Sequence, residues 1–293
     1  MRVLVTGARG KVGSAATTRL QRAGHEVITT DLGAAVHERD LQGEPPYLQA
    51  DLTDAGEVYA LVRDMDAVVH AAAIPDPMHH TPHVVFHNNV MSGFNVVEAC
   101  VRWGVRRLVN LSSEAVPGMI FAERPFLPPY LPIDELTPCR PQDPYGFGKH
   151  IVEQWCDAAA HRSQLRVISI RPSWVQHAGN YERNLGPQVR EPFEYSPAFW
   201  SYTDNDDLAD AISLAVDSDV PGHEVMYIAQ PDNVTGRPLA ELVAATLSAG
   251  QVELRETDRE DASGIDCAKA QRLLGWQATR SWRDTLDPDG RAR

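Results

Sequence analysis

The fold of this chain is decided by Val3-Leu4-Val5-Thr6-Gly7-Ala8-Arg9-Gly10-Lys11-Val12-Gly13, close to its N-terminus. The first three residues are a short β-branched run typical of a strand, and the residues after the glycines, Ser14 to Ala23, have a helical pattern. Glycines at these spacings allow a tight turn, close backbone approach to a pyrophosphate and close helix–sheet packing. The stretch therefore predicts a strand, a phosphate-binding turn and a helix.

The start of this helix is the expected site for the phosphates of a dinucleotide. A helix N-terminus presents unpaired N–H groups and the positive end of the helix dipole, and both favour a bound phosphate. The residues expected to contact a cofactor in this turn are Gly7, Arg9, Gly10, Lys11, Val12 and Gly13.

The residue that ends the second predicted strand bears on the identity of the cofactor. This strand, Glu26 to Thr30, leads into Asp31, about twenty residues past the turn, where a carboxylate accepts both hydroxyl protons of an adenosine ribose. Asp31 favours NAD because its charge would repel a 2′-phosphate. Arg9 leaves an alternative open, since a basic residue in the turn either favours NADP or is a solvated loop arginine.

Length and composition indicate a globular protein that does not bind nucleic acid or membranes. The 293 residues accommodate one large α/β domain with an appended lobe, or two smaller domains. Acidic residues (40) outnumber basic ones (27), and the net charge of -13 repels phosphodiester backbones and anionic lipids. The four cysteines lack metal-ligand spacing, and the N-terminus lacks a signal-peptide core, so we expect reduced thiols and a cytoplasmic location.

The order of predicted elements indicates an α/β protein with a Rossmann-type doubly wound parallel sheet and a small C-terminal substrate lobe. Residues 1–170 alternate short apolar strands with helical stretches, as expected for an NAD-binding domain that also holds the candidate catalytic residues. Residues 171–293 are more irregular and are expected to form a smaller lobe that partly completes the sheet. The elements predicted there are a helix at 207–216, a strand at 224–228 and a helix around 238–247.

Tyr145 and Lys149 have a spacing that suits hydride transfer at a carbinol carbon. Such a transfer also requires removal of the hydroxyl proton by a base whose pKa is lowered toward neutrality. At i and i+4 of a helix the lysine ammonium would lie beside the phenol and favour phenolate. Alone, such a pair is usually a packed aromatic and a solvated lysine, but here the upstream glycine turn, a serine pair after a predicted strand, and Arg171-Pro172 accompany it.

The combination Thr6-Gly-x-x-Gly-x-x-Gly13, Ser112-Ser113 and Tyr145-Gly-Phe-Gly-Lys149 resembles the extended short-chain dehydrogenase/reductase family, the NAD-dependent epimerase/dehydratase group. The resemblance implies that Tyr145 transfers the proton and that Lys149 also holds the nicotinamide ribose. It implies that Ser113, five residues before Gly118, binds the substrate oxygen. Further cofactor contacts implied by the resemblance are Asp51, Leu52, Ala71, Ala72, Ala73 and Asn89, and the substrate contacts expected are Ser112, Ser113, Glu114 and Arg183.

Two features of the chain depart from the family pattern. Family dehydratases carry adjacent Asp-Glu after the serine or threonine position, whereas this chain has Glu114-Ala115, which disfavours dehydration. The segment between Ser113 and Tyr145 is long and rich in proline. It is either a restrained loop over the site or a surface excursion packed by its aromatic residues, Phe121, Phe126 and Tyr130.

The short stretch from residue 173 to residue 206 predicts a compact substrate. Nucleotide-sugar enzymes of the family usually insert a sizeable region where this chain has only Ser173 to Asp206. A free sugar, sugar acid or nucleoside is therefore expected rather than a UDP-sugar. Asn180-Tyr181-Glu182-Arg183 resembles in position a loop of uronate dehydrogenases whose arginine grips the sugar carboxylate, although Arg183 could also be a solvated surface group.

Three functions remain open from the sequence. Epimerisation by transient oxidation is favoured narrowly over net dehydrogenation of a sugar or uronic acid, and a non-catalytic NAD-sensing role is the alternative outside enzymes. A homodimer is a possible assembly. The histidines at 79, 80, 83 and 87 are not expected to bind a metal, because Thr81-Pro82 is typical of an N-cap and first helical residue and would separate them.

Overall fold

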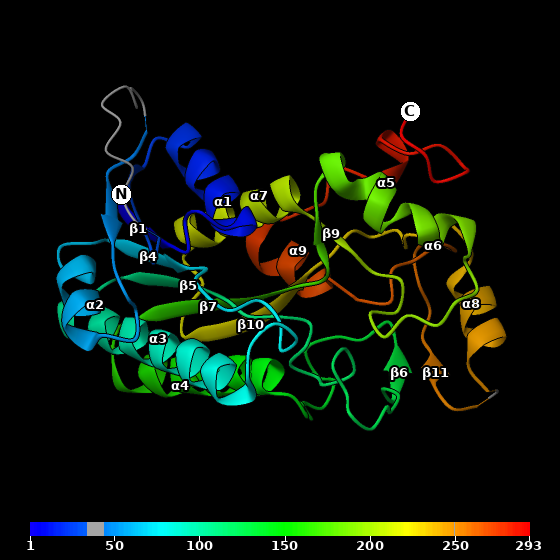
Figure 1. Cartoon of the computed structure of the whole chain (residues 1–293), viewed down its shortest axis with the longest axis horizontal. Coiled ribbons are helices and arrows are strands. Elements are labelled where there is room, and N and C mark those ends of the chain that lie inside the picture. The colour runs from blue at the N-terminus through cyan, green and yellow to red at the C-terminus, as the bar shows by residue number, and fades with distance from the viewer. Residues whose placement is uncertain (34–43, 249) are drawn as a thin grey trace.

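A parallel seven-stranded sheet forms the centre of the molecule, which is described here from a computed structural model covering residues 1–33, 44–248 and 250–293. The strand order is β10-β7-β5-β4-β1-β2-β3, and every neighbouring pair is parallel. The predicted α/β Rossmann-type fold is confirmed (Figure 1). The strands are β1 (Arg2–Thr6), β2 (Glu26–Asp31), β3 (Tyr47–Gln49), β4 (Ala67–His70), β5 (Arg107–Leu111), β7 (Arg166–Pro172) and β10 (His223–Ile228).

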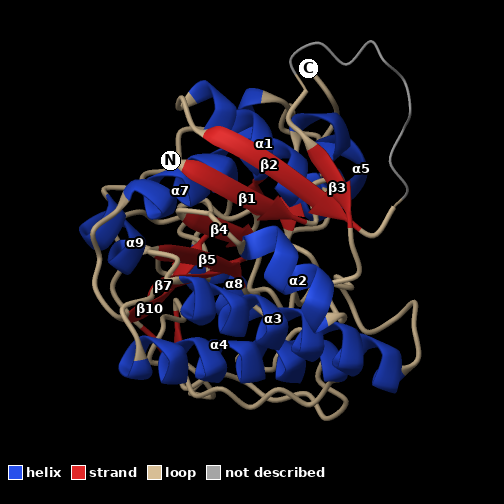
Figure 2. Ribbon diagram, turned by 90° about the vertical axis from the view of Figure 1, so that its left-hand side faces the viewer, coloured by secondary structure: helices blue, strands red, loops and turns tan. Residues whose placement is uncertain are grey.

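Helices cover both faces of this sheet, as Figures 1 and 2 show. One face carries α1 (Lys11–Arg22), α7 (Asn205–Asp217) and α9 (Ala268–Leu274), and the other carries α2 (Ala55–Val62), α3 (Pro82–Trp103) and α4 (Pro144–Arg162). Alternate strand residues feed the two cores: Val3 and Val5 pack toward α1 and α7, whereas Leu4 packs toward α2 and α3. Such double burial accounts for the nearly continuous apolar strands.

The remaining elements gather at one end of the sheet (Figure 1). They pack around a third core that contains Phe199, Trp200 and Tyr202. The division into 1–170 and 171–293 stays a proposal, because elements on each side of residue 170 pack with the other part. β10 and α9 follow residue 170 yet belong to the sheet layers, and β6 precedes it yet pairs with β11. These elements are β6 (Tyr130–Leu131), β8 (Val175–Gln176), η1 (Ala178–Asn180), α5 (Tyr181–Asn184), α6 (Gly186–Arg190), β9 (Thr203–Asp204), α8 (Leu239–Thr246), β11 (Glu253–Leu254) and η2 (Trp282–Asp284).

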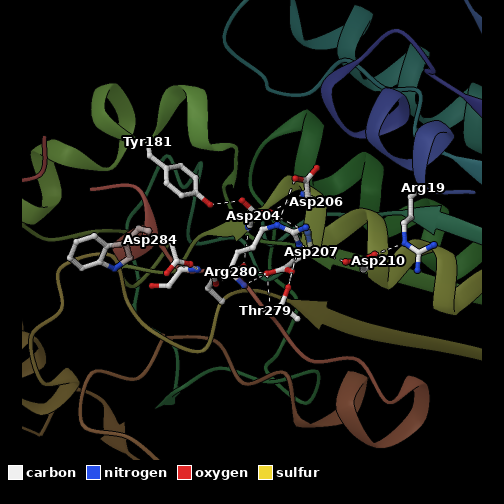
Figure 3. Close-up of polar contacts among 12 residues, drawn as sticks. Arg19, Tyr181, Asp204, Asp206, Asp207, Asp210, Thr279, Arg280 and Asp284 are labelled. Atoms are coloured by element: carbon white, nitrogen blue, oxygen red, sulfur yellow. Dashed lines mark hydrogen bonds and ion pairs between the residues drawn. The ribbon is translucent and has the colours of Figure 1, made fainter. Parts of the chain in front are cut away.

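The N-terminus of α7 joins the C-terminal segment to the sheet layers (Figure 3). Asp204 caps α7 by accepting hydrogen bonds from the backbone N–H groups of Asp206 and Asp207. Asp207 is fully buried and accepts from Thr279 and Arg280. Arg280 thus neutralises carboxylates that a metal would otherwise need to balance.

Neither a metal-binding cluster nor a membrane-spanning helix is found among the described residues. No group of three or more histidine, cysteine, aspartate or glutamate side chains is placed to hold a metal ion. None of the helices in this part of the chain is long and apolar enough to cross a membrane. Thr81 and Pro82 are the N-cap and first residue of α3, as expected, so His79 lies outside the helix, where it pairs with Asp76.

Candidate active site

Gly7 and Gly13 of the glycine turn have no room for a side chain. Gly7 has a positive φ of 64°, and a Cβ there would lie 2.6 Å from the backbone nitrogen of Ala72. A Cβ on Gly13 would lie 2.1 Å from the carbonyl oxygen of Gly7. The Gly10 N–H donates to that carbonyl at 3.0 Å, which closes the turn early, so α1 begins at Lys11 rather than at the predicted Ser14. This turn and uncapped helix start suit the diphosphate of a dinucleotide.

Asp31 lies at the end of β2, beside the glycine turn. Its carboxylate oxygens accept one backbone bond each, from Arg9 at 3.0 Å and from Leu32 at 2.8 Å, and retain lone pairs for ribose hydroxyls. The Arg9 guanidinium lies 4.0 Å from the centre of the Tyr47 ring, in the same corner. The residues present therefore fit the adenosine half of a dinucleotide.

Other expected cofactor contacts hold the backbone of the loops next to the glycine turn. Asn89 is buried; its side-chain amide accepts from the Ile74 N–H at 2.8 Å and donates to the Ile74 carbonyl at 2.9 Å. These bonds fix the end of the segment that contains Ala71, Ala72 and Ala73. The Ala72 N–H donates to the Thr6 hydroxyl at 3.2 Å. In the loop after β3, Asp51 accepts from Thr53, and the Leu52 carbonyl accepts from Asn95.

The structure brings Ser113, Tyr145 and Lys149 together. The Ser113 side chain lies near enough to the Tyr145 hydroxyl to lower its pKa, and the Lys149 ammonium lies 5.9 Å from the centre of the Tyr145 ring. All three side chains are buried. Asp143 caps α4 by accepting from the Tyr145 N–H at 2.9 Å, and thereby fixes the helix start from which Tyr145 projects.

The expected lowering of the Tyr145 pKa is not found. Burial raises the pKa of Tyr145 to about 12, and the hydrogen bond from Ser113 offsets only part of that rise. Lys149 donates instead to the Leu111 carbonyl at 2.6 Å, and burial lowers its own pKa to about 8. Tyr145 is thus a neutral phenol near pH 7, because burial, together with the charges of Asp143 and Asp76, raises its pKa.

Ser112 and Glu114 turn away from Ser113, each to a different partner. Ser112 donates to Glu153 at 2.6 Å inside the protein. Glu114 accepts from Ser173 at 2.8 Å, and burial raises its pKa to about 8, so its carboxyl is largely protonated at neutral pH. Both residues border the candidate site rather than join the Ser113–Tyr145 contact.

The proline-rich segment does reach the candidate site. Phe121 packs edge-to-face on Tyr145 with ring centres 6.0 Å apart. Phe126 instead packs against the third core, and Tyr130 bonds Asp134. Both sequence interpretations therefore apply, each to a different part of the loop.

Sequence reasoning missed the buried charges beneath Lys149. Glu153, one turn further along α4, accepts two hydrogen bonds from Arg171, at 2.8 and 2.7 Å, and its charge raises the pKa of Lys149. His70 at the end of β4 bonds Thr6 and is held neutral, since burial and the Lys149 charge lower its pKa to about 3. An acidic residue at i+4 from Lys149 was the available signal for Glu153.

Arg183, the expected carboxylate ligand, lies on the short helix α5, and its role stays a prediction. It is exposed on α5, where it donates to Asn184 at 3.1 Å. Its charge contributes to lowering the pKa of Lys11, the first residue of α1. Arg183 is therefore near the phosphate-binding turn.

Residues 3–229 match the model of the NAD dependent epimerase/dehydratase family. The chain belongs to that family. The resemblance inferred from the motifs is thereby confirmed, together with the NAD-dependent enzyme class and NAD as its cofactor.

Relatives of this chain match it over different shares of their own length. A UDP-glucose 4-epimerase of Lactobacillus helveticus is 33% identical over 54% of this chain and 48% of the relative, so this match spans about half of that protein. A UDP-glucose 4-epimerase of Bacillus subtilis is 27% identical over 97% of this chain and 96% of the relative. A solved UDP-glucose-4-epimerase from Stenotrophomonas maltophila, with bound NAD and formylated UDP-arabinopyranose, is 26% identical with a TM-score of 0.71, covering 97% of this chain and 95% of that chain.

Asp31 should set the preference of this chain for NAD over NADP. We expect NAD to bind more tightly than NADP, and Asp31→Ala to weaken NAD and narrow the difference, because it removes ribose hydrogen bonds together with the repulsive charge. Calorimetric titration of both cofactors measures this. Tighter binding of NADP to the unaltered chain would show that Arg9, rather than Asp31, determines the choice of cofactor.

Proposed function

We propose that this chain is a sugar epimerase that oxidises and re-reduces one carbinol carbon of its substrate with the aid of Ser113, Tyr145 and Lys149. The observation that carries the proposal is the buried grouping of Ser113, Tyr145 and Lys149, with Lys149 one helical turn after Tyr145. NAD, when bound, supplies reversible hydride acceptance. The matching family and the substrates in the names of its relatives support a sugar.

Each side chain has a distinct part in moving the substrate proton. Ser113 positions the substrate oxygen and passes its proton toward Tyr145, whose pKa the Ser113 side chain lowers. To take the hydroxyl proton during oxidation, Tyr145 must first lose its own phenol proton to solvent, an ionisation that the charge of Lys149 favours. Tyr145 returns the substrate proton during reduction. Lys149 holds a positive charge near the ring and binds ribose hydroxyls with the donors that Leu111 does not use.

Retention of reduced cofactor separates epimerisation from net dehydrogenation. An epimerase returns the hydride to the same substrate, so product forms over many turnovers without accumulation of NADH. A dehydrogenase of a sugar or uronic acid, the second candidate, accumulates NADH in proportion to product. A non-catalytic NAD-sensing protein forms neither.

Two substrate classes are considered, a UDP-sugar and a compact sugar. The names of relatives that match along the chain support a UDP-sugar. The alignment with the Bacillus subtilis relative spans 334 positions, more than the 293 residues of this chain, so that relative has segments which this chain lacks. The compact sugar predicted from the short stretch at 173–206 stays the alternative. A panel should therefore contain UDP-glucose, UDP-arabinose, free hexoses and uronic acids.

Two further expectations stay predictions. Exposed aromatic side chains on the packed pair α3 and α4, among them Phe86, Phe94 and Phe147, support a homodimer through this face. Light scattering measures the assembly, and fractionation of cells tests the cytoplasmic location.

A further inference from the structure

Asp143, the N-cap of α4, holds the helical turn that carries Tyr145. Its Oδ1 accepts the backbone N–H groups of Tyr145 at 2.9 Å and of Gly146 at 2.8 Å, and its carbonyl accepts the Phe147 N–H at 3.0 Å. An N-cap satisfies donors that the first turn of a helix leaves unpaired. Three hydrogen bonds to one residue therefore fix the backbone from which the Tyr145 side chain projects.

The same turn is packed against the loop that contains Ser113. A Cβ on Gly146 would lie 2.7 Å from the carbonyl oxygen of Ala115 and 2.9 Å from Oδ2 of Asp143. Ala115 in turn donates its N–H to the Ser113 hydroxyl at 3.1 Å. The close approach at Gly146 therefore sets how near Ser113 lies to Tyr145.

The second carboxylate oxygen of Asp143 brings a negative charge to this turn. Asp143 is 6% exposed, and within the described residues its buried Oδ2 has no hydrogen-bond partner. The two N–H groups on Oδ1 favour the ionised carboxyl, although burial raises the pKa of Asp143. A buried charge acts strongly on nearby groups, because the effective dielectric constant around it is lower than that of water.

Charged groups from three elements act on the Tyr145 hydroxyl. Lys149, four residues further along α4, favours the phenolate. Burial is the largest cause of the raised pKa of Tyr145, and three carboxyl groups add to it, those of Glu114 after β5, Asp143 on α4 and Asp76 after β4. Glu114 is largely protonated near pH 7, and Asp76 accepts from a neighbouring histidine. Asp143 is thus the carboxylate that acts from the same helical turn as Tyr145.

We propose that Asp143 and Gly146 are positioning residues of the candidate site. Gly146 lets the start of α4 close on the Ser113 loop, and the charge of Asp143 keeps the Tyr145 hydroxyl protonated in the resting site. Both residues act through Tyr145, and Asp143 opposes the effect of Lys149 on the phenol. The proposal rests on the proton-transfer role proposed above for Tyr145 and not on the identity of the sugar.

Direct observation of ionisation at position 145 tests the charge of Asp143. A fluorotyrosine placed there ionises at lower pH than tyrosine and reports its own ionisation by fluorine NMR, without substrate or NAD. Asp143→Asn keeps a capping oxygen and removes the charge, so the pH midpoint should fall by about one pH unit. Asp143→Ser, which also retains a capping oxygen, should show the same fall. Asp54→Asn, at the N-cap of α2, is the matched control and should leave the midpoint unchanged.

Comparison of turnover with cofactor binding tests Gly146. Gly146→Ala should lower kcat about 10- to 100-fold, because the added methyl group separates Tyr145 from the Ser113 loop, while the Kd for NAD stays within about twofold. Gly148→Ala is the matched control in the same helix. A Cβ on Gly148 would meet its nearest atom, on Val90, at the ordinary contact distance of 3.5 Å, so kcat should stay nearly unchanged.

Two results would overturn the proposal. A midpoint in Asp143→Asn equal to that of the chain with Asp143 would show that Tyr145 senses no charge at the N-cap. Equal kcat in Gly146→Ala and Gly148→Ala would show that the contact with Ala115 does not set the geometry of the site. The midpoint is measured without turnover, so it stands or fails separately from the epimerase function.

Discussion

Tyr145→Phe is expected to lower turnover about 10²- to 10⁴-fold, the range typical of general acid–base catalysis, while NAD binding stays within about twofold. The substitution removes only the hydroxyl near Ser113 and leaves the ring that Phe121 packs against. Steady-state rates on the best substrate of the panel, together with calorimetric titration of NAD, separate the two effects.

Tyr130→Phe is the matched control for this substitution. The Tyr130 hydroxyl bonds Asp134 at 2.5 Å and lies outside the Ser113–Tyr145–Lys149 group, so its loss should leave turnover nearly unchanged. Wild-type turnover in Tyr145→Phe would remove Tyr145 from the proton-transfer role, together with the site assignment that depends on it.

Glu153→Gln is expected to lower the free energy of unfolding by about 3–5 kcal/mol, because it leaves the Arg171 guanidinium buried without its counter-charge. The two side chains are 2% and 4% exposed. The same substitution removes the negative charge that raises the pKa of Lys149, so that pKa should fall below its value of about 8. Lys149 is protonated below its pKa, so the loss of activity at high pH should begin at lower pH.

A double variant keeps this prediction testable if Glu153→Gln folds poorly. Glu153→Gln combined with Arg171→Met removes both charges and should cost less stability than Glu153→Gln alone. Denaturant unfolding gives the stabilities, and rate against pH gives the shift. A pH profile identical to that of the unaltered chain, in a folded variant, would show that Glu153 does not act on Lys149.

Local patterns were enough to predict the sheet and its turn. The strand Arg107–Leu111 and the glycine turn follow from short runs whose residue pattern is local in the sequence. The sign of the Tyr145 pKa shift could not be predicted, because it depends on burial by residues distant in the chain, including Phe121 and Val85. The Glu153–Arg171 pair and the approach of Arg183 to Lys11 likewise arise from contacts between distant segments.

Following the hydride of the substrate tests the central claim most directly. A substrate of the panel that carries deuterium at the reacting carbinol carbon should yield its epimer over many turnovers per enzyme, with deuterium retained at that carbon and no NADH absorbance. That result follows if one carbon is oxidised and re-reduced by the same bound cofactor. NADH appearing in proportion to product would contradict epimerisation and make the chain a net dehydrogenase, and deuterium lost to solvent would contradict transient oxidation itself.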